Sequence, residues 1–428
     1  MESVFNSGGH YADQWGDSYS DSFASNEAPL SRPSDVPLHP GVSLSTSLED
    51  VFDLGPGRSQ RLCEARRCIL GNLLSLAAME QWIFYSRDNN HYASCGGRYV
   101  PKYYQRSWIV GAIDQLQSAD LVHHEKTRPS PSARYRSRIR PTDRFFCLAS
   151  AIPESAIRFQ PSESIVLRDS LGRPRAYQDT DHTNTMRNEV AEQNEFLASV
   201  DVRVKHPLLR YDALGFLRTE SSRICPTRKT AYRVFNDSFS LGGRWYGPWW
   251  QGLPSDLRTG IQLDSQPTVE EDFSCCHLRL LFALAGDDIK DRDAYGELGL
   301  PRAEVKLAIR VMLNAGSKDV GARAIYRELA RAHGSSAVKR CQQLMARVYD
   351  RFPRLSRYWN TGCGLRLQNV DARICTNVQK RLRRAGIACL SIHDSFIVMA
   401  AGVERLRAAM KDELEGACCE LRERGLWT

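Results

Sequence analysis

The segment that most constrains the fold lies near the end of the chain, where two short apolar runs flank a polar break. Residues 387–392 and 396–399 are mainly apolar, and the break between them begins with His393 and Asp394. Two such runs joined by a short polar loop predict a β-hairpin with Asp394 at its turn. A carboxylate at the tip of a hairpin faces a cleft, where a metal ion can reach it.

A second carboxylate occupies a comparable position earlier in the chain. Asp272 follows a predicted strand that ends near Glu271, and a predicted helix over residues 278–285 comes next. If the fold brings Asp272 and Asp394 together, the pair can hold two divalent cations about 4 Å apart, as phosphoryl transfer requires. Mg²⁺ needs only one or two protein carboxylates. Isolated aspartates, however, more often serve as turn or helix-cap residues.

A cationic helix is predicted between these two carboxylates, over residues 301–316. Its apolar residues recur with helical period and form one stripe. Arg302, Lys306 and Arg310 recur every four residues, so they form a single ridge on another face. Such a ridge suits a triphosphate, and a solvated basic face is the alternative interpretation.

These three segments, in this order, resemble motifs A, B and C in the palm and fingers of family A DNA polymerases and the related single-subunit phage RNA polymerases. Asp272 opens the motif A pattern, Arg302 and Lys306 match the Arg-x-x-x-Lys of motif B, and His393-Asp394 matches motif C. The resemblance implies an α+β fold, with an antiparallel palm sheet and helical fingers.

Two further segments strengthen the resemblance, which covers roughly residues 228–400. Residues 364–374, which include Gln368, resemble the helix that precedes motif C and contacts the primer-template. Residues 242–247, which include Arg244, resemble a Gly-Arg element that these enzymes place against nucleic acid.

The resemblance assigns a role to each candidate residue. Asp272 and Asp394, with the backbone carbonyl of Phe273, would hold two Mg²⁺ ions, with Mn²⁺ as an alternative. Lys306 would act in catalysis and bind the triphosphate, and Arg302 would hold the γ-phosphate. The remaining candidates are nucleotide-binding (His277, Arg310 and Asn314) or nucleic-acid-binding (Arg244, Gln368 and His393).

The chain also departs from the family pattern. His277 stands where family A DNA polymerases usually carry a Glu that helps to exclude the ribose 2′-OH, and residues 314–316 replace a usual Tyr. The segment between motifs A and B is also very short. The choice between deoxyribose and ribose is therefore open, and we favour DNA as the product because His277 is bulky.

Charge is distributed unevenly along the chain, whose net charge is +8. Residues 1–57 contain one Arg and nine acidic residues, so the remainder carries 57 Lys and Arg against 41 Asp and Glu, a net charge of +16. A net charge this high on residues 58–428 favours a polyanionic partner. Residues 1–57 are rich in Ser, Asp, Gly and Pro without periodicity, which predicts a disordered acidic tail. That tail would either compete with nucleic acid, dock a partner or be inert.

Residues 58–150 predict a small winged-helix-like domain that binds DNA. Helical periodicity covers residues 60–78 and 107–117, and two basic extended segments follow around a turn. Four arginines alternate in the second segment and would share one face of a strand for phosphate contact (Arg134, Arg136, Arg138 and Arg140). A charged hairpin edge that prevents aggregation is the alternative.

Residues 151–230 predict a connecting, thumb-like region. Residues 164–177 suggest a hairpin with Gly172 at its turn, and residues 184–199 suggest a mostly polar helix. Trp245, Trp249 and Trp250 follow next to Arg244. We interpret this cluster as core rather than as a platform for stacked bases.

Thirteen cysteines without a CxxC pair favour a reducing, cytoplasmic location. The start of the chain lacks a signal-peptide pattern, and no run of eighteen apolar residues occurs. We therefore expect no secretion and no membrane partner.

These features together predict a family A-like palm and fingers in residues 231–428, which catalyse template-directed nucleotidyl transfer from nucleoside triphosphates onto a DNA primer-template. The small size suggests a polymerase of a plasmid, phage or mobile element. No segment has an exonuclease pattern, so we expect no proofreading. One alternative is an RNA polymerase or primase. The other is a replication initiator or DNA-binding regulator without catalysis.

Overall fold

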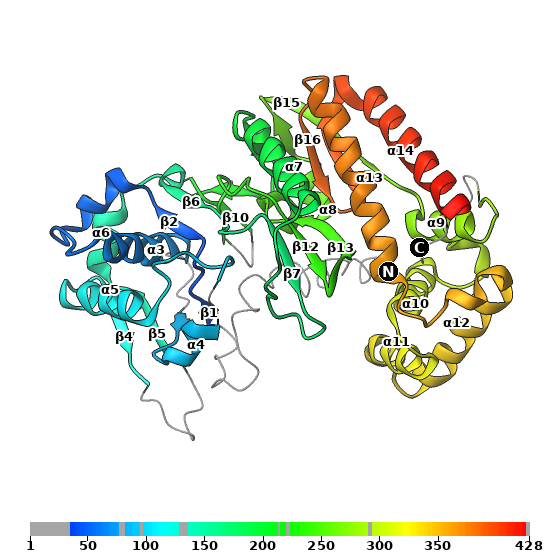
Figure 1. The fold of residues 1–428 in the computed structure, drawn as a ribbon, viewed down its shortest axis with the longest axis horizontal. Helices are drawn as coiled ribbons and strands as arrows, with labels where there is room; N and C mark the ends of the chain where they lie inside the picture. Colours follow the sequence, from blue (N-terminus) through cyan, green and yellow to red (C-terminus); the bar gives the residue numbers. More distant parts are fainter. Residues whose placement is uncertain are drawn as a thin grey trace. The chain divides into compact units, whose positions relative to one another are not determined.

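The computed structural model describes residues 35–76, 82–94, 97–127, 136–212, 215–219, 223–289 and 293–424 (Figure 1). The chain divides into two compact units. The first contains Met1–Arg233 and Tyr246–Thr268, and the second contains Val234–Trp245 and Val269–Thr428. Both units mix helices with mainly antiparallel strands, so the fold is α+β. Within the described segments, no helix combines the length and apolarity needed to cross a membrane.

The first unit contains several short sheets and six of the described α-helices. Its helices are α3 (Gln60–Leu76), α4 (Asn89–Ser94), α5 (Arg106–Ser118), α6 (Asp143–Ala149), α7 (Asp181–Ala198) and α8 (Ser255–Arg258). Its strands are β1 (Val36–Pro37), β2 (Val42–Leu44), β3 (Ile83–Tyr85), β4 (Val122–Glu125), β5 (Ser137–Pro141), β6 (Ile157–Phe159), β7 (Ile165–Arg168), β8 (Val202–Val204), β9 (Arg210–Tyr211), β10 (Leu217–Arg218), β11 (Arg223–Ile224) and β14 (Ile261–Leu263).

The predicted two-stranded wing is part of a larger sheet. β4 and β5 pair antiparallel, as the sequence predicts, but β5 also pairs with β3, and β1 joins β3 in parallel. The order β1-β3-β5-β4 places β5 inside a four-stranded sheet rather than at a free edge. The winged-helix assignment of this region therefore remains a prediction.

The prediction of a disordered tail over residues 1–57 is wrong for its final part. β2 pairs with β6, and Phe52, at the end of a 3₁₀ helix over Thr46–Phe52, stacks on Phe145 with ring centroids 5.1 Å apart. Leu38, Leu44 and Phe52 are almost fully buried. Their partners lie far along the chain, so local composition could not reveal them. Residues 1–34 lie outside the described part.

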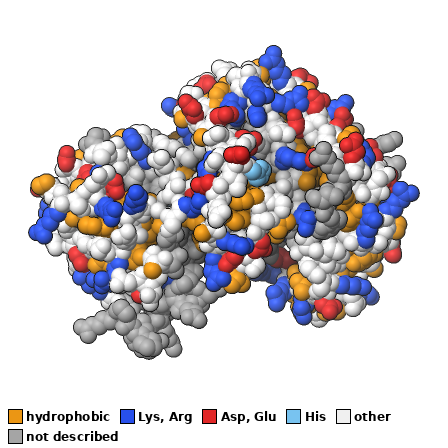
Figure 2. Space-filling view, viewed as in Figure 1, with side chains coloured by type: hydrophobic (Ala, Val, Ile, Leu, Met, Phe, Trp, Pro, Cys, Tyr) orange, Lys and Arg blue, Asp and Glu red, His pale blue; other side chains and the backbone are white. Residues whose placement is uncertain are grey.

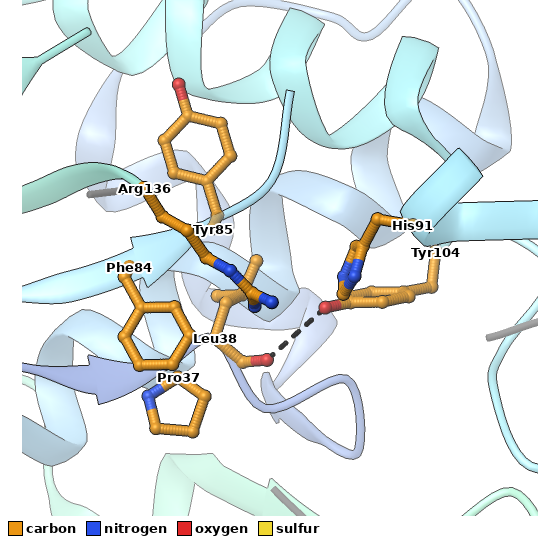
Figure 3. A pocket seen from close by; sticks show the side chains of 7 residues that line it. All are labelled: Pro37, Leu38, Phe84, Tyr85, His91, Tyr104 and Arg136. Atoms are coloured by element: carbon orange, nitrogen blue, oxygen red, sulfur yellow. Dashed lines mark hydrogen bonds between the residues drawn. The ribbon is translucent and has the colours of Figure 1, made fainter. Parts of the chain in front are cut away.

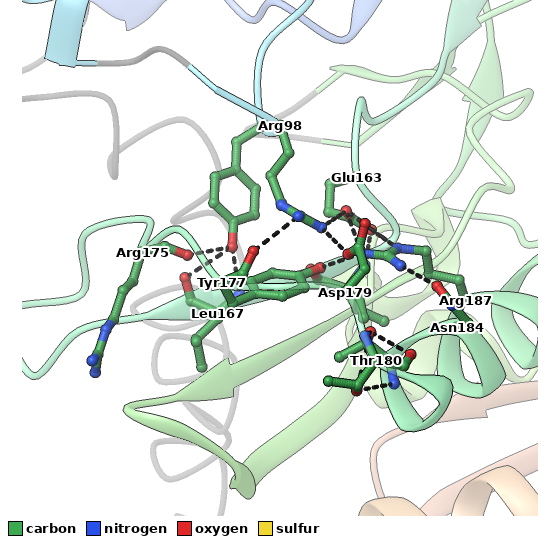
Figure 4. Close-up of polar contacts among 12 residues, drawn as sticks. Arg98, Glu163, Leu167, Arg175, Tyr177, Asp179, Thr180, Asn184 and Arg187 are labelled. Atoms are coloured by element: carbon green, nitrogen blue, oxygen red, sulfur yellow. Dashed lines mark hydrogen bonds and ion pairs between the residues drawn. The ribbon is translucent and has the colours of Figure 1, made fainter.

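A network of charged residues joins the segment before α5 to the start of α7 (Figure 4). Arg98 and Arg187 both pair with the buried Glu163, at 3.1 and 3.0 Å, and both also pair with Asp179. The Arg98 guanidinium lies over the Tyr177 ring, and its central carbon, Cζ, is 3.9 Å from the ring centroid. These contacts fix the strand-to-helix connection within the first unit.

The predicted reversal and the polar helix are present, with different bounds: β7 and the returning segment share a single bridge, Arg168 to Pro174, and α7 begins at Asp181 rather than at residue 184. The chain reverses at Gly172, whose φ of 79° is in the left-handed region, and Arg175 N–H donates to Leu167 O. α7 begins with a capping box between Thr180 and Thr183, which satisfies backbone donors at the helix start.

The second unit contains the motif-bearing elements. Its helices are α9 (Cys276–Leu284), α10 (Arg302–Asn314), α11 (Lys318–His333), α12 (Ala337–Arg351), α13 (Gly364–Arg384) and α14 (Val403–Arg424). The hairpin strands are β16 (Cys389–Ile392) and β17 (Ser395–Met399), and β17 lies beside β15 (Gln266–Asp272), which enters from the first unit. α13 packs against both α9 and α14, and α10, α11 and α12 pack together (Figure 1).

A hairpin of β12 (Tyr232–Asn236) and β13 (Ser238–Tyr246) carries the Gly-Arg element. Gly242 and Gly243 have φ values of 72° and 91°. A Cβ on Gly243 would lie 2.6 Å from the Phe235 ring, so this position needs glycine for space as well as for conformation.

The tryptophan cluster belongs to the core, as we interpret from the sequence. Trp245, Trp249 and Trp250 are almost fully buried. The indole of Trp245 donates to Thr376 Oγ1 on α13 at 3.0 Å, which satisfies its buried N–H.

Candidate functional site

The end of β15 and the turn of the β16–β17 hairpin come together in the second unit. His393 and Asp394 form the two-residue loop between the paired residues Ile392 and Ser395. The N–H of Phe273, one residue after Asp272, donates to the carbonyl of Asp394 at 3.4 Å. The two carboxylate-bearing residues that the sequence predicts are thus neighbours.

Side chains on both segments hold this junction in place. Ser395 Oγ donates to Glu270 Oε1 at 2.8 Å. The buried Phe273 ring meets Phe396 edge-on, with centroids 6.0 Å apart. Because the apolar and polar contacts join the same two strands, the paired strands hold the end of β15 and the short hairpin loop with Asp394 in place.

The backbone is strained on both sides of the junction. Cys275, which precedes α9, and His393, which precedes Asp394, have φ values of 55° and 57°. Residues with a Cβ rarely adopt this left-handed region, and such strain is concentrated at functional sites. Here it turns the chain sharply at the two points where the carboxylates are presented.

The electrostatics of Asp272 reflect its neighbours. Although the residue as a whole is exposed, protein atoms around its carboxylate desolvate it, and the nearby charge of Asp394 adds repulsion. Together these effects raise the pKa of Asp272 to about 7, while the positive charge of Lys306 acts in the opposite direction. Asp394 and Lys306 therefore both lie within electrostatic range of Asp272.

The donor set at this junction fits a hard divalent cation. Two neighbouring carboxylates, whose repulsion raises the pKa of one of them, are stabilised by a cation between them. Mg²⁺ retains several water ligands and needs few protein oxygens. No group of three or more His, Cys, Asp and Glu side chains suited to a metal occurs in the described segments, so any cation here would rely on the two aspartates, backbone oxygen and water.

The basic ridge of α10 is present as predicted. Arg302 and Lys306 are exposed, and Arg302 Nε donates to Asp293 Oδ2 at 3.0 Å. Arg310 is also on the exposed side, but partial desolvation of its guanidinium lowers its pKa. Because the Arg302 pair with Asp293 is itself exposed, an incoming phosphate can compete for this arginine.

The opposite face and the end of α10 are fixed by other helices. Glu304 accepts from His333 Nε2 at 3.1 Å and from Arg340 Nε at 2.6 Å, which ties α10 to α11 and α12. Asn314, at the C-terminal end, lies against Gly364 and leaves no room there for a Cβ. Asn314 therefore occupies a helix-packing position, and its predicted role in nucleotide binding is untested.

Asp371 is the principal site residue that the sequence pattern did not reveal. It lies on α13 with its side chain 2 % exposed, and accepts from His277 Nε2 at 2.7 Å and from Arg244 Nε at 3.2 Å. Burial alone raises the pKa of Asp371, but Arg244 and His277 more than offset this effect, so the pKa is lowered. One signal was available, because Asp371 falls four residues after Leu367 within the apolar stripe of its helix.

This cluster changes the interpretation of Arg244 and His277. Arg244 is expected to contact nucleic acid, yet its guanidinium is already bound by the buried carboxylate of Asp371. His277 is the second residue of α9, the helix that begins four residues after Asp272. The cluster therefore joins β13, α9 and α13, and Arg244 is available to a ligand only through its remaining partly exposed surface.

Gln368 and His393 occupy different surroundings. Gln368 is half-buried on α13, where the next residue, Asn369, donates to the carbonyls of Phe239 and Gly242, both at 3.2 Å. His393 is half-buried at the hairpin turn. Contact of Gln368 or His393 with nucleic acid remains a prediction.

The predicted arginine face of the first unit is largely covered. Arg138 and Arg140 do share a face, because both guanidinium groups lie over the Trp82 ring. Arg138, however, is buried and pairs with Glu125 at 2.9 Å and Asp35 at 3.1 Å. The sequence predicts an arginine that is free to contact phosphate, and for Arg138 this is wrong. β5 is an inner strand, and residues near β1, such as Asp35, cover the face that carries Arg138.

Arg136 lies in a small aromatic pocket (Figure 3). Its guanidinium carbon lies 5.3 Å from the Phe84 ring centroid, and Tyr104 and His91 line the other side. Arg134 lies outside the described residues. Phosphate contact therefore remains a prediction for Arg136 and Arg140.

Comparisons with known proteins add little to this geometry. No model of a known protein family matches the chain, and no curated protein matches it. Among solved structures, the chain is similar to the POL domain of Pol1 from M. smegmatis, in complex with DNA primer-template and dNTP, at 12% identity and a TM-score of 0.26. The match covers 89% of this chain and 65% of that one.

Proposed function

We propose that the second unit catalyses template-directed nucleotidyl transfer, most specifically as a DNA polymerase. The observation that carries this proposal is the junction of Asp272 with Asp394, within electrostatic range of Lys306. These residues come from three elements separated in sequence. Their proximity supports the proposal, because the resemblance to family A polymerases implies that these three motifs meet at one site.

The metal requirement follows from the donor set. Asp272, Asp394 and the backbone carbonyl of Phe273 would hold Mg²⁺, with Mn²⁺ as an alternative. Bound there, the ions would stabilise the charge that develops on the attacking and leaving oxygens. The raised pKa of Asp272 supports this role, because a carboxylate crowded by a second one is stabilised by a cation.

The basic ridge of α10 would bind the triphosphate. Arg302 is exposed and can exchange its surface pair with Asp293 for a bidentate contact to phosphate. Lys306 would hold the triphosphate nearer to the carboxylates and donate a proton to the leaving pyrophosphate, and Arg310 would extend the ridge. The anchoring of Glu304 by His333 and Arg340 supports a fixed orientation of this ridge.

Sugar selection would depend on His277. Asp371 holds its Nε2 at 2.7 Å, so the imidazole has a defined orientation rather than free rotation. A fixed, bulky ring beside the nucleotide would obstruct a 2′-OH. This reasoning favours deoxyribonucleotides, and RNA synthesis is the alternative.

Primer extension tests the proposal. The full chain is incubated with a labelled primer-template, Mg²⁺ and either dNTPs or rNTPs, beside Asp394→Asn and the exposed control Asp350→Asn. We expect extension with dNTPs by the wild type and the control, and a loss of at least 100-fold in Asp394→Asn, because electrostatic stabilisation of the transition state is lost. Preference for rNTPs would support the RNA polymerase alternative.

Absence of extension with either nucleotide set, on primed and unprimed templates, would overturn the proposal. If the same preparation still bound DNA, the initiator or regulator alternative would replace it. Equal activity in Asp394→Asn and the wild type would show that any polymerisation does not arise at this junction.

A further inference from the structure

A row of arginines on α11 forms a charged surface separate from the α10 ridge. Arg323, Arg327 and Arg331 recur every four residues and are all exposed. The buried residues of this helix, Gly321, Ile325 and Leu329, form the opposite stripe. Because residues four apart are neighbours on a helix, the three arginines form one continuous row that faces away from the packed side.

The α11 arginine row has no neutralising partner within the described segments. No described carboxylate forms an ion pair with Arg323, Arg327 or Arg331, whereas Arg340 on the neighbouring helix is paired with Glu304 at 2.6 Å. Residues 318–359 contain ten Lys and Arg but only three Asp and Glu. Asp319 and Glu328 lie four and three residues before Arg323 and Arg331 on the same helix, but neither forms an ion pair with this row. Like charges four residues apart destabilise a helix, so a row without ion pairs is more consistent with an external polyanion than with a structural role.

An exposed aromatic side chain lies beside the row. Tyr326 is 41% exposed and lies three residues after Arg323, which places the two side chains next to each other on the helix surface. Figure 2 shows Lys and Arg side chains over the region where Figure 1 places α11 and α12. An aromatic ring beside a cationic row suits a nucleic acid whose bases are unpaired, because such bases can stack while the phosphates meet the cations.

We propose that the α11 arginine row and Tyr326 bind single-stranded nucleic acid. The binding itself follows from charge and exposure and does not require catalysis. The identity of the strand as the template of a polymerase rests on the proposed function. Duplex DNA is the competing ligand, and it would use the arginines but leave Tyr326 without a base to stack on.

Binding of a fluorescent oligo(dT) to the full chain, measured by anisotropy over a range of salt concentrations, tests the proposal. The variant R323Q/R327Q/R331Q is compared with R384Q/R405Q/R422Q, which removes the same charge from three exposed arginines on α13 and α14. Each phosphate contact to a single strand contributes about 0.7 to the log–log salt slope. We expect the α11 variant to lose about 2 from the slope and about 100-fold in affinity near 0.1 M salt.

The control variant should keep a slope near that of the wild type. Tyr326→Ala should weaken oligo(dT) binding about tenfold and leave binding of a blunt duplex unchanged, because only unpaired bases stack on the ring. Thermal unfolding should show that R323Q/R327Q/R331Q is at least as stable as the wild type, since it removes like-charge repulsion.

Equal slopes for the two triple variants would overturn the proposal. A loss of duplex binding as large as the loss of oligo(dT) binding, with no effect of Tyr326→Ala, would overturn the assignment to single strands. Failure of this inference can be distinguished from failure of the proposed function, because the two depend on different residues. Asp394→Asn should lose primer extension but still bind oligo(dT) normally. Inactive wild-type protein that shows the expected slopes would leave this inference standing alone.

Discussion

At the scale of single residues, Asp371 is the charge whose removal should be most costly. Its carboxylate is buried and is bound by Arg244 and His277. Replacing it with Asn leaves the largely buried Arg244 guanidinium without its counter-charge. We expect Asp371→Asn to lower the free energy of unfolding by about 3 kcal/mol. Urea denaturation at neutral pH measures this change.

The pH dependence of that effect has a defined sign. Because the folded protein lowers the pKa of Asp371, the ionised carboxylate stabilises the fold above the unfolded pKa of about 3.9. This contribution disappears as the pH falls through the lower, folded pKa. The stability gap between wild type and Asp371→Asn should therefore narrow below about pH 4. Asp412→Asn, which breaks the exposed pair with Arg381, is the control and should cost under about 1 kcal/mol.

Asp272 should show the opposite pH dependence. Its pKa is raised to about 7, so the folded protein retains a proton that the unfolded chain releases at lower pH. In EDTA, the wild type should lose stability as the pH rises from about 4 to 7, and Asp272→Asn should lose less. Thermal unfolding across this pH range, with Asp350→Asn as a control, measures the difference. Parallel curves for wild type and Asp272→Asn would contradict the raised pKa.

Metal addition extends the same test. Mg²⁺ at pH 8 should raise the unfolding temperature of the wild type, because a ligand that binds only the folded state stabilises it. Asp272→Asn should gain less, since one of the two carboxylates is gone. An equal gain in both proteins would place the cation elsewhere.

At the scale of elements, the β12–β13 hairpin depends on close packing at Gly243. Alanine at this position combines a φ of 91° with a Cβ only 2.6 Å from the Phe235 ring. We expect Gly243→Ala to lower the free energy of unfolding by about 2 kcal/mol or more, from backbone strain and steric overlap. Gly252→Ala is the matched control, because its Cβ would meet open space. Similar stability of the two variants in urea would contradict this packing.

Elements with a strong local pattern were predictable, and elements made by distant partners were not. α10 and α13 follow their apolar periodicity, and the β16–β17 hairpin follows its two apolar runs. In contrast, β1 and β2 contain two and three residues and form only because β3 and β6 supply partners from far along the chain. A strand that short carries no periodicity, and its composition resembles that of a disordered tail.

The same distinction applies to the candidate site. Asp272, Asp394 and Lys306 could be named from motif order, since each lies within its own recognisable segment. The roles of Arg244 and His277 could not, because Asp371 reaches them from a third element. Likewise Arg138 fits an alternating basic strand, but one of its two counter-charges, Asp35, precedes it by 103 positions. Local sequence gives the charge of a residue, and the fold decides whether that charge is free to bind a ligand.

At the scale of the whole molecule, the uneven distribution of charge should regulate affinity for nucleic acid. Residues 1–34 contain five acidic residues and one Arg, whereas residues 58–428 carry a net charge of +16. Neutralising the five acids by Asn or Gln raises the net charge of the chain from +8 to +13 without changing its length. Charges interact over about 30 Å at 0.01 M salt but over only about 3 Å at 1 M.

The neutralised variant should therefore bind oligo(dT) several-fold more tightly than the wild type at low salt, and the two affinities should converge as the salt concentration rises. Anisotropy titrations at several salt concentrations measure this convergence. A matched variant in which five Ser or Asn residues of the same segment are replaced by Ala keeps the charge and should bind as the wild type does. A gain in affinity that persisted at high salt would indicate direct contact by this segment rather than long-range repulsion. No gain in affinity at low salt would mean that the charge of residues 1–34 does not influence nucleic-acid binding by residues 58–428.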